Sequence, residues 1–201
     1  MDLMEIFTLV TGILYIILEI RQKNFMWIVG VFTSLAAMWV FFRQGLYASF
    51  CLNTYYLVTS FIGLWQWRKD SRRLGAESPV AGNENDVIHL NRLPLKTVVL
   101  SAILMVAGTL AFGWVMERLE NPMSLLDASV AVLSAIATWW LVRSYPQQWW
   151  LWIVADTLST VLCISQGMWW MTALYAAYTL SAVYGYIHWK KNGQYVSDKT
   201  L

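Results

Sequence analysis

The chain has 201 residues, of which 58% are hydrophobic and only 13% are charged. Because a soluble domain usually carries about a quarter charged residues, this composition excludes an ordinary water-soluble surface. The net charge of +2 is too small to suggest a nucleic-acid partner, and the 13 Trp and 10 Tyr are typical of chains that meet both membrane–water interfaces.

Seven apolar stretches are each long enough to cross the roughly 30 Å hydrocarbon core of a bilayer as a helix. They lie near 4–20, 26–42, 46–67, 95–117, 124–142, 148–165 and 168–189. The first is interpreted as a retained span, because no Lys or Arg precedes it and no small-residue cleavage site follows it. The polar segment 68–94 is predicted to be a linker loop that ends at Pro94, in the first turn of the fourth span.

The basic residues alternate between the two sides of these spans. One side carries twelve of the fourteen Lys and Arg residues, and the other carries only Arg43 and Arg118. Since the side rich in Lys and Arg faces the cytoplasm, we expect an outside N-terminus and a cytoplasmic C-terminus.

The third and seventh spans align without a gap at an offset of 122. The matching segments are Gln44-Gly45 and Gln166-Gly167, Gly63 and Gly185, and Trp67-Arg68-Lys69 and Trp189-Lys190-Lys191. The second and sixth spans align through Trp27 and Trp152, with a three-residue shift. The pattern predicts an all-α membrane protein of seven transmembrane helices with 3 + 1 + 3 parallel repeats, as in the SWEET sugar transporters. Repeat one is about 4–67, the linking helix about 95–117 and repeat two about 124–189, within a single transmembrane domain over 1–201.

The sixth span carries the best candidates for a binding site. Trp149, Trp152 and Asp156 are spaced i, i+3 and i+7, which puts them on one helix face. At a rise of 1.5 Å per residue, Asp156 is about 12 Å deep and close to the midplane. A carboxylate there costs at least about 2.5–3.5 kcal/mol unless it faces a partner or a wet cavity. Asp156 is therefore either a functional acid or a structural acid bonded to a neighbouring Ser or Tyr.

Asn53 and Tyr175 occupy equivalent positions in the two repeats and reach the depth of Asp156. Tyr56 and Tyr178 lie one turn further in, where each either binds substrate or packs between helices. Asn53 is a candidate because an amide in hydrocarbon needs hydrogen-bond partners.

Two further candidates lie nearer the membrane edges. Trp27 matches Trp152 in the repeat, and Asp127, near the outer end of the fifth span, either attracts a cation at the mouth or is solvated there. Glu19 is expected to be a solvated interface charge. The remaining tryptophans at span ends are expected in the aromatic belt of the membrane, and they are Trp65, Trp67, Trp150, Trp169, Trp170 and Trp189.

The segment from Arg143 to Trp152, followed by Asp156 and Gln166-Gly167, resembles the signature of the PnuC family of vitamin transporters. That family carries a Trp-x-x-Trp motif on the sixth core span, a polar residue four positions later and a turn with Gly. The first half agrees through the segments Leu46-Tyr47-Ala48-Ser49 and Gly63-Leu64-Trp65-Gln66-Trp67, and Asp127 falls where the family often has Asp.

The resemblance implies a homotrimeric carrier in the bacterial inner membrane that imports nicotinamide riboside by facilitated diffusion. A cytoplasmic kinase would then trap the substrate. Asp156 replaces an expected Asn and Asn53 an expected Gln, and branches similar to PnuC carry thiamine or riboflavin, so a thiamine carrier is the alternative.

Other classes of function fit the sequence less well. An enzyme would need a second acid, His or Cys beside Asp156, and a proton-coupled channel gains nothing from a stacking Trp pair. The sequence has no P-loop, HExxH or G-x-S-x-G motif. We therefore expect no catalysis, cofactor or metal, and Cys51 and Cys163 are expected to be reduced.

Overall fold

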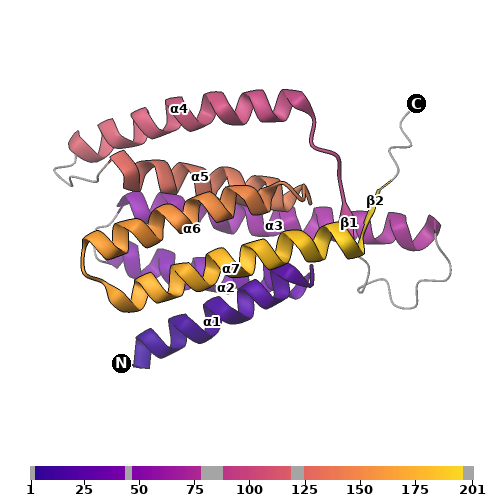
Figure 1. Ribbon diagram of the computed structural model, residues 1–201, viewed down its shortest axis with the longest axis horizontal. Coiled ribbons are helices and arrows are strands. Elements are labelled where there is room, and N and C mark those ends of the chain that lie inside the picture. Colours follow the sequence, from indigo (N-terminus) through magenta and orange to yellow (C-terminus); the bar gives the residue numbers. More distant parts are fainter. Residues whose placement is uncertain (1–2, 44–46, 78–87, 119–124, 197–201) are drawn as a thin grey trace. The chain divides into compact units, whose positions relative to one another are not determined.

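The computed structural model describes residues 3–43, 47–77, 88–118 and 125–196 (Figure 1). The helices are α1 (Leu3–Ile20), α2 (Phe25–Arg43), α3 (Tyr47–Glu77), α4 (Leu95–Arg118), α5 (Leu125–Val142), α6 (Gln148–Ser165) and α7 (Trp169–Asn192). The strands are β1 (Ile88–Leu90) and β2 (Gly193–Tyr195). Within the described residues these seven helices confirm the predicted number, and all bounds except the end of α3 agree within three residues. The Gln44-Gly45 turn and Leu46 of the expected repeat lie outside this part of the chain.

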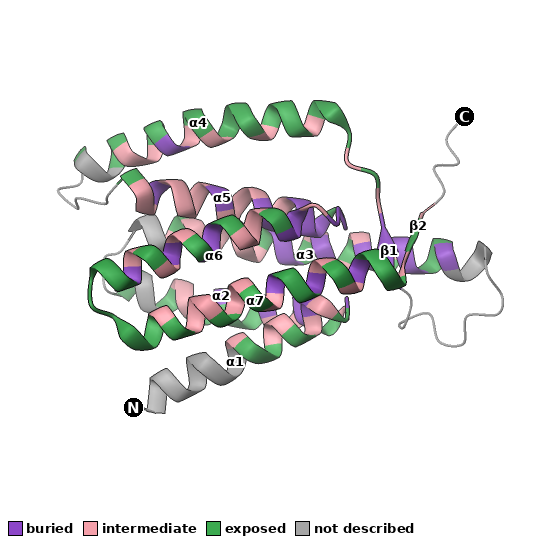
Figure 2. Cartoon of the chain, viewed as in Figure 1, coloured by how far each residue is buried: buried purple, intermediate pink, exposed green. Residues whose placement is uncertain are grey.

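The prediction of a linker loop over 68–94 is wrong at both of its ends. Helix α3 continues to Glu77, and residues 88–90 form a strand that pairs in parallel with β2, His89 opposite Gln194. The helix persists because Trp67, Asp70 and Leu74 repeat at helical spacing on a buried face, which the polar residues between them conceal in the sequence. Figure 2 shows this alternation of buried and exposed positions along α3.

Among the described residues, three helices are followed by a residue in the left-handed backbone region. Gln22 after α1 has a φ of 49°, Ser144 after α5 has 55°, and Gly167 after α6 has 71°. At α6 the amides of Gly167 and Met168 donate to the carbonyls of Ile164 and Cys163, which caps the helix in the manner of a Schellman motif. Gly167 adopts this φ without strain, whereas the other two carry side chains that disfavour it.

The described residues form two compact units. Those of the first fall within Met1–Asn91, Leu141–Pro146 and Ile187–Leu201, and those of the second within Arg92–Trp140 and Gln147–Tyr186. The single transmembrane domain stays a prediction.

In the first unit, strand β1 is held along both of its edges. Leu90 accepts a hydrogen bond from the Val196 amide at 2.9 Å, on the side of β2. On the other side the Gln22 carboxamide donates to the His89 carbonyl at 2.9 Å and accepts from the His89 amide at 2.7 Å. The Gln22 side chain thus makes the two hydrogen bonds that a neighbouring strand would make with His89. The backbone of Gln22 has a positive φ at this position.

Two tryptophans at helix ends lie in the interior of the first unit. Trp67 donates its indole N–H to the Leu141 carbonyl at 3.1 Å, and Trp189 donates to the Ile20 carbonyl at 3.0 Å. Both are 0% exposed, and their ring centroids are 6.3 Å apart. The aromatic-belt prediction is therefore wrong for these two, because each indole caps the end of another helix. Glu19 is likewise buried and not solvated.

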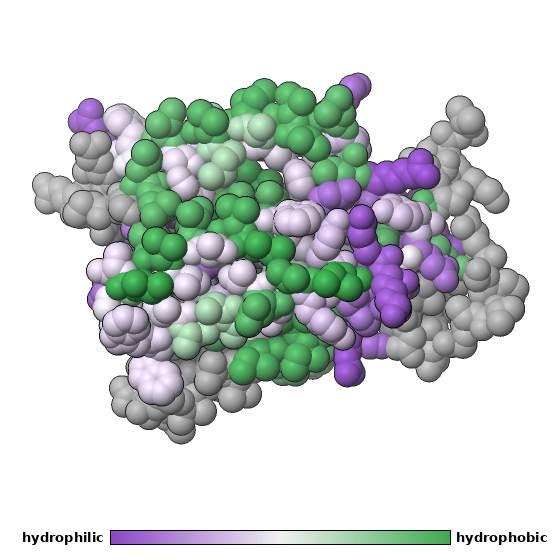
Figure 3. All heavy atoms as spheres, viewed as in Figure 1, coloured by the Kyte–Doolittle hydropathy of each residue, from purple (hydrophilic) through white to green (hydrophobic). Residues whose placement is uncertain are grey.

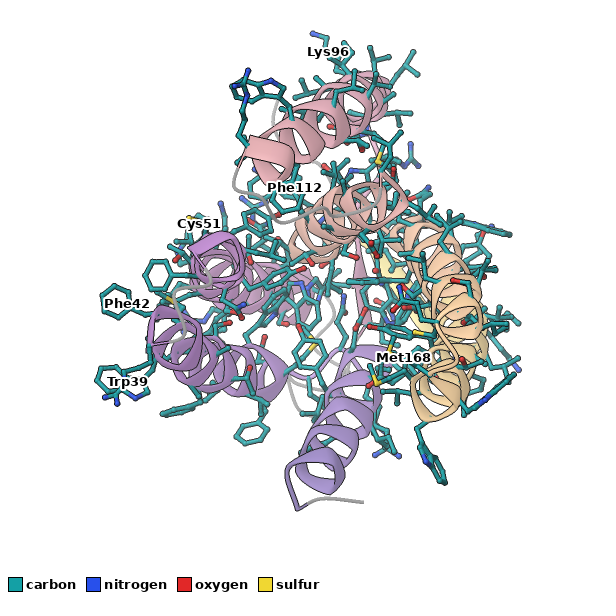
Figure 4. The ribbon with its side chains drawn as sticks, turned by 90° about the vertical axis from the view of Figure 1, so that its left-hand side faces the viewer. Trp39, Phe42, Cys51, Lys96, Phe112 and Met168 are labelled. Atoms are coloured by element: carbon teal, nitrogen blue, oxygen red, sulfur yellow. The ribbon has the colours of Figure 1, made fainter. Side chains whose placement is uncertain are left out.

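The other tryptophans assigned to the aromatic belt are exposed, as expected, and they are Trp65, Trp150, Trp169 and Trp170. On α2, Trp39 and Phe42 are exposed (Figure 4), and the Phe42 ring lies 5.9 Å from the Phe50 ring of α3.

In the second unit, α4 is apolar along most of its length and exposes hydrophobic side chains (Figure 3). The Trp140 indole of α5 donates to the Ser101 hydroxyl of α4 at 3.0 Å. By length and apolar composition alone, two segments among the described helices are suited to cross a membrane, namely Leu95–Val115 and Leu125–Val142.

Candidate substrate-binding site

Helix α6 is fixed against α7 by a tryptophan that lies on a glycine. The Trp149 ring is so close to Gly185 that a Cβ there would lie 2.6 Å from it. Only glycine allows this approach. The contact sets the rotation of α6, and Trp152 and Asp156 follow at the next two turns.

Asp156 is 8% exposed. Its backbone carbonyl accepts a hydrogen bond from the Thr160 hydroxyl at 2.7 Å. Across the described residues, no group donates a hydrogen bond to the carboxylate. The neighbouring Ser159 hydroxyl donates instead to the Ala155 carbonyl at 2.9 Å. A buried carboxylate without donors is costly, so this one is suited to a cationic or hydrogen-bonding ligand.

Trp152 supplies the complementary group one turn before Asp156. Its indole nitrogen is buried and has no acceptor within the described part of the chain. Residues at i and i+4 share a helix face, so the N–H donor and the carboxylate acceptor are neighbours on α6.

Helix α7 brings two phenol groups near Asp156. Tyr175 and Tyr178 form an edge-to-face pair with centroids 6.0 Å apart and an interplanar angle of 88°. Both hydroxyl groups lie within electrostatic range of the Asp156 carboxylate. Cys163 lies within range of both Tyr175 and Asp127, so the second unit joins these candidates in one region.

The first unit contains the other three candidates. Asn53 and Tyr56 are half-buried on α3, and the Tyr56 ring lies 5.7 Å from that of Tyr55. Trp27 is buried against Gly63 and meets the edge of Trp67 at 5.0 Å. That these three join Asp156 in one site stays a prediction.

Sequence reasoning missed one residue near the candidates of the first unit. Tyr15 on α1 lies within electrostatic range of Glu19 and Tyr56. Its polar hydroxyl in the middle of an apolar span was a usable signal. No cluster of three or more His, Cys, Asp or Glu suited to a metal occurs among the residues described.

Apolar helices that carry a buried acid beside indole and phenol groups have the chemistry that a membrane transporter of small organic molecules needs at its binding site. The chain belongs to the nicotinamide mononucleotide transporter family, which it matches over residues 2–191. This result confirms the resemblance seen in the sequence. The family is one of transporters, and its members are multi-pass proteins of the inner membrane.

The chain is similar to several proteins that carry the name nicotinamide riboside transporter PnuC. The Neisseria mucosa protein is 27% identical, over 90% of this chain and 70% of that protein. The Haemophilus influenzae protein is 24% identical, over 90% of this chain and 76% of that protein. The Escherichia coli protein is 23% identical, over 96% of this chain and 87% of that protein. A crystal structure of the vitamin B3 transporter PnuC matches with a TM-score of 0.67 and 25% identity, covering 92% of this chain and 79% of that one.

Proposed function

We propose that this protein imports nicotinamide riboside across the inner membrane by facilitated diffusion. The observation that carries the proposal is the pair on α6, a buried Trp152 N–H without an acceptor and a buried Asp156 carboxylate without a donor among the described residues. Nicotinamide riboside has a flat cationic ring and a polar sugar. Its charge matches the carboxylate, its ring can stack on aromatic faces, and its amide and hydroxyls can bond to the remaining polar groups.

Local geometry supports the 3 + 1 + 3 repeat and favours one alignment of its two copies. Trp27 lies on Gly63 and Trp149 on Gly185, and the two pairs are related by the same offset of 122. Gln22 and Ser144, which share the unusual φ, have that offset too. We therefore pair Trp27 with Trp149 without a shift, so that Trp152 corresponds to Gly30.

The remaining features complete the proposal. The N-terminus lies outside and the C-terminus in the cytoplasm, and the chain forms one transmembrane domain in a homotrimer. Transport needs no ion gradient, because a cytoplasmic kinase that phosphorylates the substrate keeps its inward gradient steep. Thiamine is the second candidate, since Asp156 stands where an amide is expected and a carboxylate favours any cationic ring.

Binding and uptake together test this function. Calorimetry on the purified protein should show binding of nicotinamide riboside and none of riboflavin. Uptake of labelled nicotinamide riboside into cells should persist when a proton uncoupler is added. Binding of thiamine alone would establish the alternative, and binding of neither cation would refute the proposal.

A further inference from the structure

The exposed face of α3 carries a groove in the C-terminal half of the helix, where the apolar span ends. Its volume is about 610 Å³, which is within the size range of small-molecule sites. Apolar side chains that include Phe61 and Trp65 line one part of it, and four cations line the other, namely Arg68, Lys69, Arg72 and Arg73.

The two faces of α3 at this end have different partners. The buried face includes Asp70, whose carboxylate accepts hydrogen bonds from Gln66 at 3.0 Å and from Asn91 at 3.0 Å. Phe61, Trp65 and Arg68 recur at helical spacing on the exposed face. Asp70 is the one acid among the described side chains of α3, and it is engaged on the other face. The four cations of the groove therefore concentrate positive charge among the described side chains of α3.

The order of side chains along the groove matches one kind of ligand. From Phe61 to Arg73 the helix rises about 18 Å, with aromatic groups first and cations last. Lys69 places its ammonium 4.9 Å from the centre of the Trp65 ring, at the boundary between the two parts. In the proposed orientation, the aromatic part lies at acyl-chain depth and the cations at headgroup depth of the inner leaflet.

We propose that this groove binds an anionic phospholipid of the inner leaflet, with its phosphate between Arg68 and Arg72 and its acyl chains along Phe61 and Trp65. Clusters of basic residues directly cytoplasmic of a membrane span attract anionic headgroups. The groove adds an apolar wall that a general preference for positive charge inside the cell does not require.

The end of α7 is an internal control. Lys190 and Lys191 stand 122 residues after Arg68 and Lys69 and are exposed. One turn later, Gln194 and Tyr195 of β2 stand where α3 has Arg72 and Arg73. This second basic pair is therefore suited to set orientation but not to hold a headgroup.

Delipidated full-length protein in neutral detergent tests the proposal. Phosphatidylglycerol should raise the melting temperature more than phosphatidylcholine does, and native mass spectrometry should show it bound. The double variant Arg68→Gln, Arg72→Gln should need about 30-fold more phosphatidylglycerol, because each basic residue near an anionic headgroup contributes about fivefold to binding. The matched variant Lys190→Gln, Lys191→Gln should respond like wild type.

Several outcomes would overturn this assignment. An equal response to both lipids, or an unchanged response of the Arg68 and Arg72 double variant, would remove the headgroup site. Disulfide-linked dimers of a Trp65→Cys variant would show that a second copy of the chain covers the groove. The double variant should still bind nicotinamide riboside in calorimetry, and a loss there would place the groove on the substrate path instead. Binding of nicotinamide riboside to the wild-type protein is measured separately from lipid binding. Failure of the proposed function can therefore be distinguished from failure of the lipid proposal.

Discussion

The contact of α2 with α3 and that of α6 with α7 begin alike and then diverge. Each has a tryptophan on a glycine, Trp27 on Gly63 and Trp149 on Gly185. One turn later α2 has Gly30, where a Cβ would lie 2.8 Å from the Ser60 hydroxyl, so the two helices are in close contact. In the corresponding place α6 has Trp152.

The next turn completes the difference. A buried serine, Ser34, stands on α2 where α6 has Asp156. Small residues at such positions favour close helix packing in membranes. The first pair of helices is thus closed with small side chains, and the second carries the aromatic and acidic groups. If the proposed repeat is right, the two copies share a scaffold and differ in the side chains that they place at these two turns.

The strongest test of this difference replaces the acid and its counterpart. Asp156→Ala should weaken binding of nicotinamide riboside more than 100-fold, since losing one member of a buried charge pair costs about 3–5 kcal/mol. Ser34→Ala, at the equivalent position, should bind like wild type. Calorimetry measures both, and thermal melting without ligand verifies that both variants are folded. Wild-type affinity in the Asp156 variant would remove the acid from the site.

A smaller effect is expected from removing one hydrogen-bond donor. Trp152→Phe keeps an aromatic face but loses the indole N–H, so binding should weaken about tenfold, in line with about 1–1.5 kcal/mol for a hydrogen bond. The control is Trp150→Phe, on the exposed side of α6, which should leave the dissociation constant unchanged. Equal losses in both variants would mean that the indole at 152 has no special role.

The two glycines provide a third comparison, which separates scaffold from site. Gly63→Ala and Gly185→Ala each force a methyl group into a tryptophan ring, and overpacking of this kind costs about 1–3 kcal/mol. Both should lower the melting temperature by similar amounts. Gly185→Ala should weaken substrate binding more than Gly63→Ala does, because it displaces the helix that carries Trp152 and Asp156. Equal losses of binding in the two variants would contradict the division of roles.

Sequence periodicity was sufficient to place the helices but not the contacts at their ends. The apolar length of each span and the Lys and Arg pattern determine where a membrane helix starts and stops, which is why α6 agrees to the residue. The burial of Trp67, Trp189 and Glu19 depends on residues far apart in the chain. Trp189, for example, bonds to the carbonyl of Ile20, 169 residues away. No local pattern encodes that pairing.

The site shows the same limit. The helical spacing of Trp149, Trp152 and Asp156 was readable, because it depends on one helix. The register between the repeats could not be read from the sequence. The match of Trp27 with Trp152, at a three-residue shift, looked as good as the unshifted match with Trp149. The Trp–Gly contacts and the two φ values favour the unshifted register.

The smallest expected effects concern the two helix ends with a positive φ, and here the equivalent positions should respond in opposite directions. A non-glycine residue in the left-handed region costs about 1–2 kcal/mol, which a glycine avoids. Ser144→Gly should raise the free energy of unfolding by about 1 kcal/mol, because the Ser144 hydroxyl is buried without a partner among the described residues and its loss costs nothing. Gln22→Gly gains the same relief but loses both hydrogen bonds to His89, which cover the edge of β1.

Leaving the buried His89 amide and carbonyl unsatisfied costs about 1–3 kcal/mol for each group, so Gln22→Gly should be net destabilising. Melting temperatures of the two variants in the same detergent measure this difference in sign. A Gln22→Gly protein as stable as the Ser144→Gly protein would mean that the carboxamide does not hold the strand. The αL conformation at residue 22 would then be only strain, and not the means by which α1 is joined to β1.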